Sequence, residues 1–274
     1  MKAQTLRLSL AVAAGVTLLF TLTACTTVPV TGRHELNLVS ADQETQLGLT
    51  SFEQLKQGTP VEADPTANSQ VDRVGRRIAA VASKDLPNAK WEFVVFKSHE
   101  ANAFCLPGGK VGVYTGILPI TQDDAGLATV LGHEIGHAVA HHGASRMSHA
   151  MVSQGIGNWA GSQISASQYA QYQSLFMGLY GLGSTYAVEL PYSREQESEA
   201  DHIGLIYMAR AGYDPKAAVE FWKRFAAYNQ QQGGGKNSLL AKFTSTHPLD
   251  AARIKDLESL LPQAEAEYAK AQGK

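Results

Sequence analysis

His133-Glu134-Ile135-Gly136-His137 is the most informative stretch of this sequence. Apolar residues recur at spacings of three and four around it, which predicts that it lies on a helix. With 3.6 residues per turn, His133 and His137 share one face and can bind the same metal ion, whereas Glu134 lies about 100° further round. Catalytic zinc keeps three protein ligands and one water. The stretch therefore predicts a zinc site in which Glu134 is the general base.

Length and composition limit the class of protein. The chain has 274 residues, of which 44% are hydrophobic, and this is enough for one globular domain with a substantial core. Its formal net charge is -2, so the composition offers no basic surface for nucleic acid. We therefore expect no nucleic-acid partner.

The N-terminus has the pattern of an export signal. Lys2 and Arg7 precede an uncharged stretch over residues 8–22, which is too short to cross a bilayer comfortably and is typical of a signal peptide. It ends in Leu22-Thr23-Ala24-Cys25, which resembles the bacterial lipobox. We expect residues 1–24 to be a signal peptide, Cys25 to carry a lipid anchor and residues 25–39 to be a tether. The alternative is an ordinary signal peptide that happens to precede a cysteine.

A location follows from this interpretation. Thr26, rather than Asp, follows Cys25, and by resemblance to enterobacterial sorting this favours the periplasmic face of the outer membrane, with the inner membrane as the alternative. If Cys25 is lipidated, Cys105 is the remaining cysteine and no intramolecular disulfide can form. The fold is then expected to depend on its core.

Helix starts and strands can be predicted along the chain. The predicted helix starts are capping boxes or Asp-Pro pairs, at Ser40 with Gln43, Asp64-Pro65, Thr121 with Asp124, Ser193 with Gln196, and Asp214-Pro215. Aromatic and β-branched runs predict strands over residues 91–96 and 111–114. Residues 229–237 are predicted to form a flexible loop, and the charged tail over residues 262–274 a frayed helix.

The segment between the two predicted strands ends in a Pro-Gly-Gly turn, which forces a tight reversal. An edge strand at this place, next to the His133 helix, can bind an extended peptide by strand addition. We expect the substrate-binding residues to be Asn102, Ala103, Phe104, Pro107, Gly108 and Gly109. The alternative is a hairpin with no role in binding.

Residues 147–188 contain no Asp, Glu, Lys or Arg. Polar residues interrupt every apolar run in this stretch, so it is not predicted to cross a membrane. We expect helical segments that cover the active site or face a membrane; a buried helical hairpin is the alternative.

The third zinc ligand has to come from elsewhere in the chain. Glu195, Glu197 and Glu199 are the candidates on a predicted helix. Glu197 shares a helix face with Asp201, so Glu197 can reach the metal while Asp201 accepts a hydrogen bond from a ligand histidine. Glu195 and Glu199 lie roughly opposite, on a face expected to be solvated, and His202 is a weaker rival ligand.

These motifs together resemble the HtpX-like and BepA-like metallopeptidases of family forty-eight, which also includes prenyl-protein proteases and a mitochondrial inner-membrane protease. The resemblance covers about Ser40 to Leu261 and rests on N-A-F-x-x-P-G-G from Asn102 to Gly109, H-E-x-x-H from His133, E-x-x-x-D from Glu197 to Asp201, and His247-Pro248 with Arg253. It implies that His133, His137 and Glu197 bind zinc, that Glu134 is catalytic, and that Asp201 and Arg253 support the ligands. Membrane-embedded substrates and a repeat-mediated partner surface are not implied, because no transmembrane helix and no C-terminal repeat domain are predicted.

His247 precedes a proline, which predicts that its ring lies at a helix N-terminus. A neutral imidazole near zinc can donate a hydrogen bond to the oxyanion, or it can bind the metal as a fourth ligand and hold the enzyme inactive. The BepA-like proteins suggest the inhibitory role by resemblance. The alternative is a helix-capping histidine with no part in catalysis.

We therefore expect a mostly helical α+β domain over residues 40–261, of the zincin-like (gluzincin) type, with a small β-sheet next to the His133 helix. The expected function is that of a zinc-dependent endopeptidase of the bacterial cell envelope, with one zinc ion per chain, that degrades misfolded or misassembled envelope proteins. A chaperone-like or assembly-factor lipoprotein that rarely cleaves is the alternative.

Overall fold

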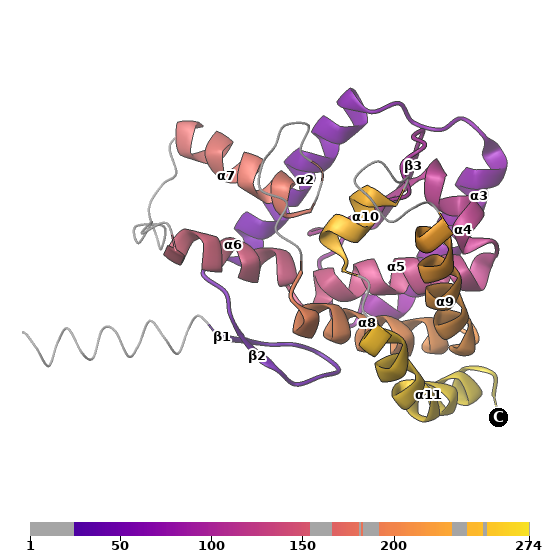
Figure 1. The fold of residues 1–274 in the computed structure, drawn as a ribbon. Coiled ribbons are helices and arrows are strands. Elements are labelled where there is room, and N and C mark those ends of the chain that lie inside the picture. The colour runs from indigo at the N-terminus through magenta and orange to yellow at the C-terminus, as the bar shows by residue number, and fades with distance from the viewer. Residues whose placement is uncertain are drawn as a thin grey trace, which may run out of the picture.

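The computed structural model describes residues 25–153, 166–180, 182, 192–231, 240–248 and 251–273. The predicted signal peptide lies outside these residues, as do parts of the uncharged stretch and most of the predicted glycine-rich loop. The described residues are mostly helical and include a small three-stranded sheet, so the predicted fold class is confirmed (Figure 1).

The helices are α2 (Ala41–Gly58), α3 (Pro65–Ala82), α4 (Leu118–Thr121), α5 (Asp124–Val139), α6 (His142–Ser153), α7 (Ala166–Leu179), α8 (Arg194–Arg210), α9 (Lys216–Gln231), α10 (Ala241–Thr246) and α11 (Ala251–Ala271). The strands are β1 (Cys25–Thr27), β2 (His34–Leu36), β3 (Glu92–Phe96), β4 (Ala103–Leu106) and β5 (Lys110–Tyr114), and a 3-10 turn covers Thr115–Ile117.

Most of the predicted helix starts are present. The capping boxes at Ser40 and Ser193 both form, and Asp64 caps α3 ahead of Pro65. The predicted box at Thr121 is wrong. The Thr121 hydroxyl donates to the Leu118 carbonyl at the end of α4, and Asp123 instead caps α5 by accepting from the Gly126 amide at 2.8 Å.

The three-stranded sheet separates two hydrophobic clusters. Its order is β3-β5-β4, with β3 and β5 parallel and β4 antiparallel to β5. Alternate side chains of a strand point to opposite faces. Ala103 and Cys105 of β4 therefore join the cluster around α3, α5 and α8, whereas Phe104 and Leu106 join the cluster around α2, α6 and α7. Strand β4 forms one edge of this sheet, and α5 packs against it.

Helix α5 lies near the centre of the molecule and packs closely against α8 (Figure 1). Its residues from Gly126 to Val139 are all buried. Glycines allow the two backbones to touch: a Cβ atom on Gly204 would lie 2.7 Å from the Gly132 carbonyl carbon, and one on Gly136 would lie 2.7 Å from the Ala200 oxygen. This close approach sets the distance between the side chains that α5 and α8 direct toward each other.

Residues 25–39 differ from the predicted tether. Strands β1 and β2 pair antiparallel, with Cys25 opposite Leu36, and lie beside α6 and α8 (Figure 1). Val28 and Val39 are buried in the hydrophobic clusters of the domain. Apolar burial and side-chain bonds to α8 therefore hold this hairpin on the domain.

The C-terminal residues also differ from prediction. Helix α11 continues to Ala271 and packs on α8 rather than fraying, because Ala264 is buried and Arg210 Nε donates to Glu267 at 2.7 Å. The described part of the uncharged stretch forms α6 and α7, with Met147, Met151 and Phe176 in the core. Within the described residues, none of the helices combines the length and apolar character that crossing a bilayer requires.

Candidate metal centre

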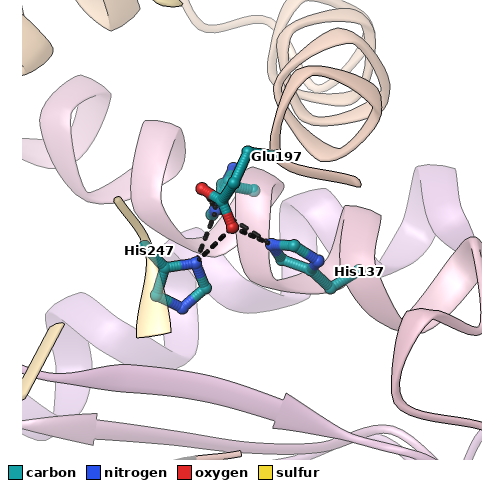
Figure 2. Close-up of side chains that lie close together, drawn as sticks. His137, Glu197 and His247 are labelled. Carbon is teal, nitrogen blue, oxygen red and sulfur yellow. Dashed lines mark hydrogen bonds and ion pairs between the residues drawn. The ribbon is translucent and has the colours of Figure 1, made fainter. Parts of the chain in front are cut away.

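Four elements bring the predicted site residues together. Helix α5 provides His133, Glu134 and His137, α8 provides Glu197 and Asp201, the residue after α10 is His247, and α11 provides Arg253. All seven side chains are buried. Figure 2 shows the Glu197 carboxylate between the rings of His137 and His247.

The spacing of the donor atoms fits one metal ion. Nε2 of His133 lies 3.1 Å from Nε2 of His137, and the Glu197 oxygens lie 3.5 Å from the former and 3.3 Å from the latter. Nδ1 of His247 lies 3.2 Å from Nε2 of His133 and 2.9 Å from Glu197 Oε1. Donors bound to tetrahedral zinc at roughly 2.0–2.1 Å are separated by about 3.3 Å. Three imidazoles and one carboxylate at these separations therefore suit zinc.

Asp201 and Arg253 hold the donors in place. Asp201 Oδ1 lies 2.9 Å from Nδ1 of His133, so this ring nitrogen donates to the carboxylate and leaves Nε2 free for a metal. Arg253 donates to Asp201 at 2.9 Å and pairs with Glu197 at 2.8 Å. Its guanidinium carbon lies 3.7 Å from the centre of the Trp222 ring. No sequence pattern singled out Trp222, because its contact with Arg253 joins α9 to α11.

Glu134 has a buried carboxylate oxygen without a hydrogen bond among the described residues. This atom, Oε1, lies 3.6 Å from Nε2 of His247. Burial raises the pKa of Glu134 to about 7, against the opposing charge of His247. A carboxylate with a raised pKa and a free oxygen is suited to accept a proton near neutral pH.

His247 does not lie at a helix N-terminus, which corrects the prediction. It follows the last residue of α10, and its backbone amide donates to the Phe243 carbonyl at 2.8 Å. Its ring is stacked at 5.2 Å from Tyr192, which in turn stacks on His137 at 3.9 Å. Tyr192 was not identified from the sequence, since it lies just before α8 without any metal-ligand pattern.

The predicted peptide-binding segment lies beside this site. Ala103 and Phe104 are in β4, Asn102 precedes it, and Pro107, Gly108 and Gly109 form the turn, where both glycines have positive φ. Helix α5, which carries Glu134, packs against β4. Burial raises the pKa of the Cys105 thiol in the middle of β4, and the charge of Glu134 raises it further. All four residues of β4 are buried, at most 2% exposed, so both the side chains and the backbone edge of this strand are covered in this structure.

Glu199 is not on a solvated face, which corrects a second expectation. It is buried, and although burial raises its pKa, hydrogen bonds from His142, Arg33 and Thr31 lower the value to about 2. Glu195 is exposed, as expected. His202 points away from the site, with Nε2 3.2 Å from Gln263 Oε1 of α11.

The fold and this donor set define a metallopeptidase of the H-E-x-x-H class. The sequence profile of Peptidase family M48 matches residues 65–261, and the chain belongs to this family. It is therefore a metalloendopeptidase.

The mitochondrial metalloendopeptidase OMA1 of Schizosaccharomyces pombe is 36% identical over 241 residues, covering 87% of this chain and 67% of that protein. Human OMA1 is 31% identical over 246 residues, covering 86% of this chain and 46% of that protein. The beta-barrel assembly-enhancing protease of Escherichia coli is 28% identical over 232 residues, covering 84% of this chain and 46% of that protein.

The predicted location is contradicted by these comparisons. The similar proteins with the higher identities are named as mitochondrial, whereas the E. coli beta-barrel assembly-enhancing protease is more distant, at 28% identity. This does not fit a lipoprotein on the periplasmic face of the outer membrane. The prediction relied on the signal-peptide pattern, the lipobox-like residues 22–25 and Thr26, all of which lie at the N-terminus.

Proposed function

We propose that this chain is a zinc-dependent endopeptidase, with one zinc ion per chain, that degrades misfolded or misassembled envelope proteins. The observation that carries this proposal is the convergence of His133, His137 and Glu197 around one point, with Glu134 beside them and free to accept a proton. The name of the E. coli relative, a beta-barrel assembly-enhancing protease, supports the substrate class.

The residues have separate tasks in peptide hydrolysis. When bound, zinc supplies a Lewis acid that polarises the scissile carbonyl and acidifies the attacking water. His133, His137 and Glu197 hold the ion, while Asp201 and Arg253 orient His133 and Glu197. Glu134 accepts the proton of the water and then delivers it to the leaving amine.

The backbone edge of β4 is the proposed binding place for the peptide. Strand β4 is at the sheet edge and packs on α5, which carries Glu134, but its residues are buried, so strand addition requires this edge to open first. Recognition through backbone hydrogen bonds depends little on side chains, which suits an enzyme that acts on many unfolded proteins.

We also propose a lipid anchor at Cys25, on the pattern Leu22-Thr23-Ala24-Cys25. The test is fractionation of cells that express wild type or Cys25→Ala. The wild type should sediment with membranes and the variant should become soluble; retention of the variant on membranes rejects the anchor.

Casein cleavage by the purified protein tests the main proposal. Wild type should degrade casein, lose activity in a chelator and regain it on addition of zinc. Cleavage that persists in chelator after zinc has been removed contradicts the zinc mechanism. If zinc is bound but casein stays intact, the chaperone-like or assembly-factor alternative is favoured.

A further inference from the structure

The second ring nitrogen of His137 is held by another histidine. Nδ1 of His137 lies 2.8 Å from Nδ1 of His142, and Nε2 of His142 lies 2.9 Å from Glu199 Oε2. His142 is fully buried and Glu199 nearly so. Each ligand histidine therefore has a carboxylate behind it: Asp201 directly behind His133, and Glu199 behind His137 with His142 between them.

This arrangement determines which nitrogens carry protons. An ionised carboxylate can only accept, so His142 must donate to Glu199 from Nε2. In a neutral imidazole the other nitrogen is an acceptor, so Nδ1 of His142 accepts from Nδ1–H of His137. His137 is thereby held with an unprotonated Nε2, the atom that faces His133 and Glu197. This is the tautomer that can bind a metal.

The N-terminal hairpin completes the arrangement. Arg33 Nε donates to Glu199 Oε2 at 2.7 Å, and the Thr31 hydroxyl donates to Glu199 Oε1. Arg33 also pairs with Glu35 of β2 at 2.6 Å. The hairpin is anchored on the domain by burial of Val28 and by a hydrogen bond from the Leu38 amide to Ser148 Oγ at 2.9 Å.

Glu35, His142 and Glu199 lie close enough together to suggest a second metal site. The contacts argue against it. The Arg33 guanidinium pairs with both carboxylates, so a positive charge already occupies the position that a metal would take. These contacts instead hold the Glu199 carboxylate in place and, through it, the ring of His142.

We propose that His142 and Glu199 are positioning residues for the metal ligand His137, and that Arg33 and Thr31 make the N-terminal hairpin a working part of the metal centre. This inference rests on the proposed zinc site. It assigns a role to Thr31 and Arg33, which lie before the stretch matched by the family profile, since that stretch begins at residue 65.

Substitutions of His142 in the full chain test the proposal. The zinc dissociation constant is measured by competition with a fluorescent chelator, and the cobalt-substituted protein is examined by visible absorption. Outer partners of metal ligands typically change metal affinity by roughly 10–100-fold, so His142→Ala should weaken zinc binding by about tenfold or more. His142→Asn places an amide oxygen near Nδ1 and should recover part of the affinity. His142→Gln can still donate to Glu199 from its amide nitrogen but places no acceptor at the position of Nδ1, so it should not recover the affinity.

The hairpin is tested by Arg33→Ala and Glu199→Gln, with Arg33→Lys as the conservative change. Arg76→Ala is the matched control, because Arg76 also pairs with a carboxylate, that of Asp72 at 2.8 Å, but lies on the exposed face of α3. Arg33→Ala and Glu199→Gln should weaken zinc binding and shift the cobalt spectrum, Arg33→Lys should do so less, and Arg76→Ala should leave both unchanged.

The outcomes separate this inference from the proposed function. If wild type binds no zinc, the proposed function fails. If wild type binds zinc and His142→Ala or Arg33→Ala stays within twofold of it, the positioning role is overturned. Melting temperatures of the metal-free proteins control for folding: equal zinc affinity in His142→Asn and His142→Gln at equal stability also overturns the role.

Discussion

Glu134 is the residue on which peptide hydrolysis should depend. Its Oε1 faces the site without a hydrogen bond among the described residues, so it does not hold the donors together. Glu134→Gln keeps the size but cannot accept a proton. We expect unchanged zinc content and a fall in casein cleavage of roughly 10²–10⁴-fold, measured by atomic absorption and by release of labelled peptides. Wild-type activity in this variant would exclude Glu134 as the base.

Glu197 and Glu199 should behave differently although they are two residues apart. Glu197 lies among the donor atoms, whereas Glu199 acts only through His142. We expect Glu197→Ala to bind little zinc and Glu199→Ala to bind most of the wild-type amount when both are compared at the same saturating zinc concentration. The exposed Glu195 provides the control, as Glu195→Ala. The reverse order in metal analysis would move the ligand to Glu199.

His247 has two uses that predict opposite variants. Its Nδ1 lies among the donors of the site, 3.2 Å from Nε2 of His133, which favours a fourth ligand that holds the enzyme inactive. We therefore expect His247→Ala to raise the basal cleavage rate of an unfolded substrate and to keep zinc bound. A fall in turnover of tenfold, about 1.4 kcal/mol in activation free energy, would instead identify His247 as an oxyanion donor.

At the scale of elements, the contact between α5 and α8 sets the distance between Glu197 and the two histidines of the site. Gly204 has no room for a side chain, since a Cβ atom would lie 2.7 Å from backbone atoms of Gly132 and His133. Gly204→Ala should push the helices apart and separate Glu197 from the two histidines. We expect destabilisation of about 1–3 kcal/mol together with weaker zinc binding, measured by denaturant unfolding and chelator competition.

Gly58 is the matched control for this substitution. It ends α2, and a Cβ atom there would meet nothing within 4 Å. Gly58→Ala should leave zinc affinity unchanged and should not lower stability. If Gly204→Ala is equally harmless, the close approach of α5 and α8 does not position the donors.

At the scale of the whole molecule, a partly buried ion pair joins α2 to the turn between α5 and α6. His141 Nδ1 lies 2.7 Å from Glu44 Oε2. Burial lowers the pKa of His141, but the hydrogen bond and the charge of Glu44 outweigh it, so the pKa is raised above 6.5. Because the folded pKa is raised, this pair stabilises the fold fully below about pH 6.5 and less as pH rises through the folded value.

Glu44→Gln removes the charge of this pair and keeps its size. We expect wild type to exceed the variant in unfolding free energy at about pH 6 and the difference to shrink by about pH 9, both measured by urea unfolding. Glu53→Gln, on the exposed face of α2, should show no such dependence. If the difference in unfolding free energy between wild type and Glu44→Gln does not change with pH, the ion pair between His141 and Glu44 does not stabilise the fold.

Local sequence predicted most of the helix starts and the candidate metal ligands. The spacing of His133 and His137, and of Glu197 and Asp201, sufficed because helical geometry places residues four apart on one face, whatever the rest of the chain does. The same locality explains the wrong box at Thr121: two hydroxyl or carboxyl residues near a helix start compete, and the extended backbone of Asp123 decides between them.

Only the tertiary structure decided which residues contact and position the donor side chains. Glu199 follows Glu197 by two residues, and its burial depends on a hairpin more than 160 positions away, through Arg33 and Thr31. Trp222 under Arg253 and Tyr192 over His137 likewise join separate elements. These contacts have no period along the chain, because they form between helices and strands that the core brings together. The sequence by itself therefore predicted which residues converge as candidate metal ligands, and the packing of the folded chain decided which residues hold them in position.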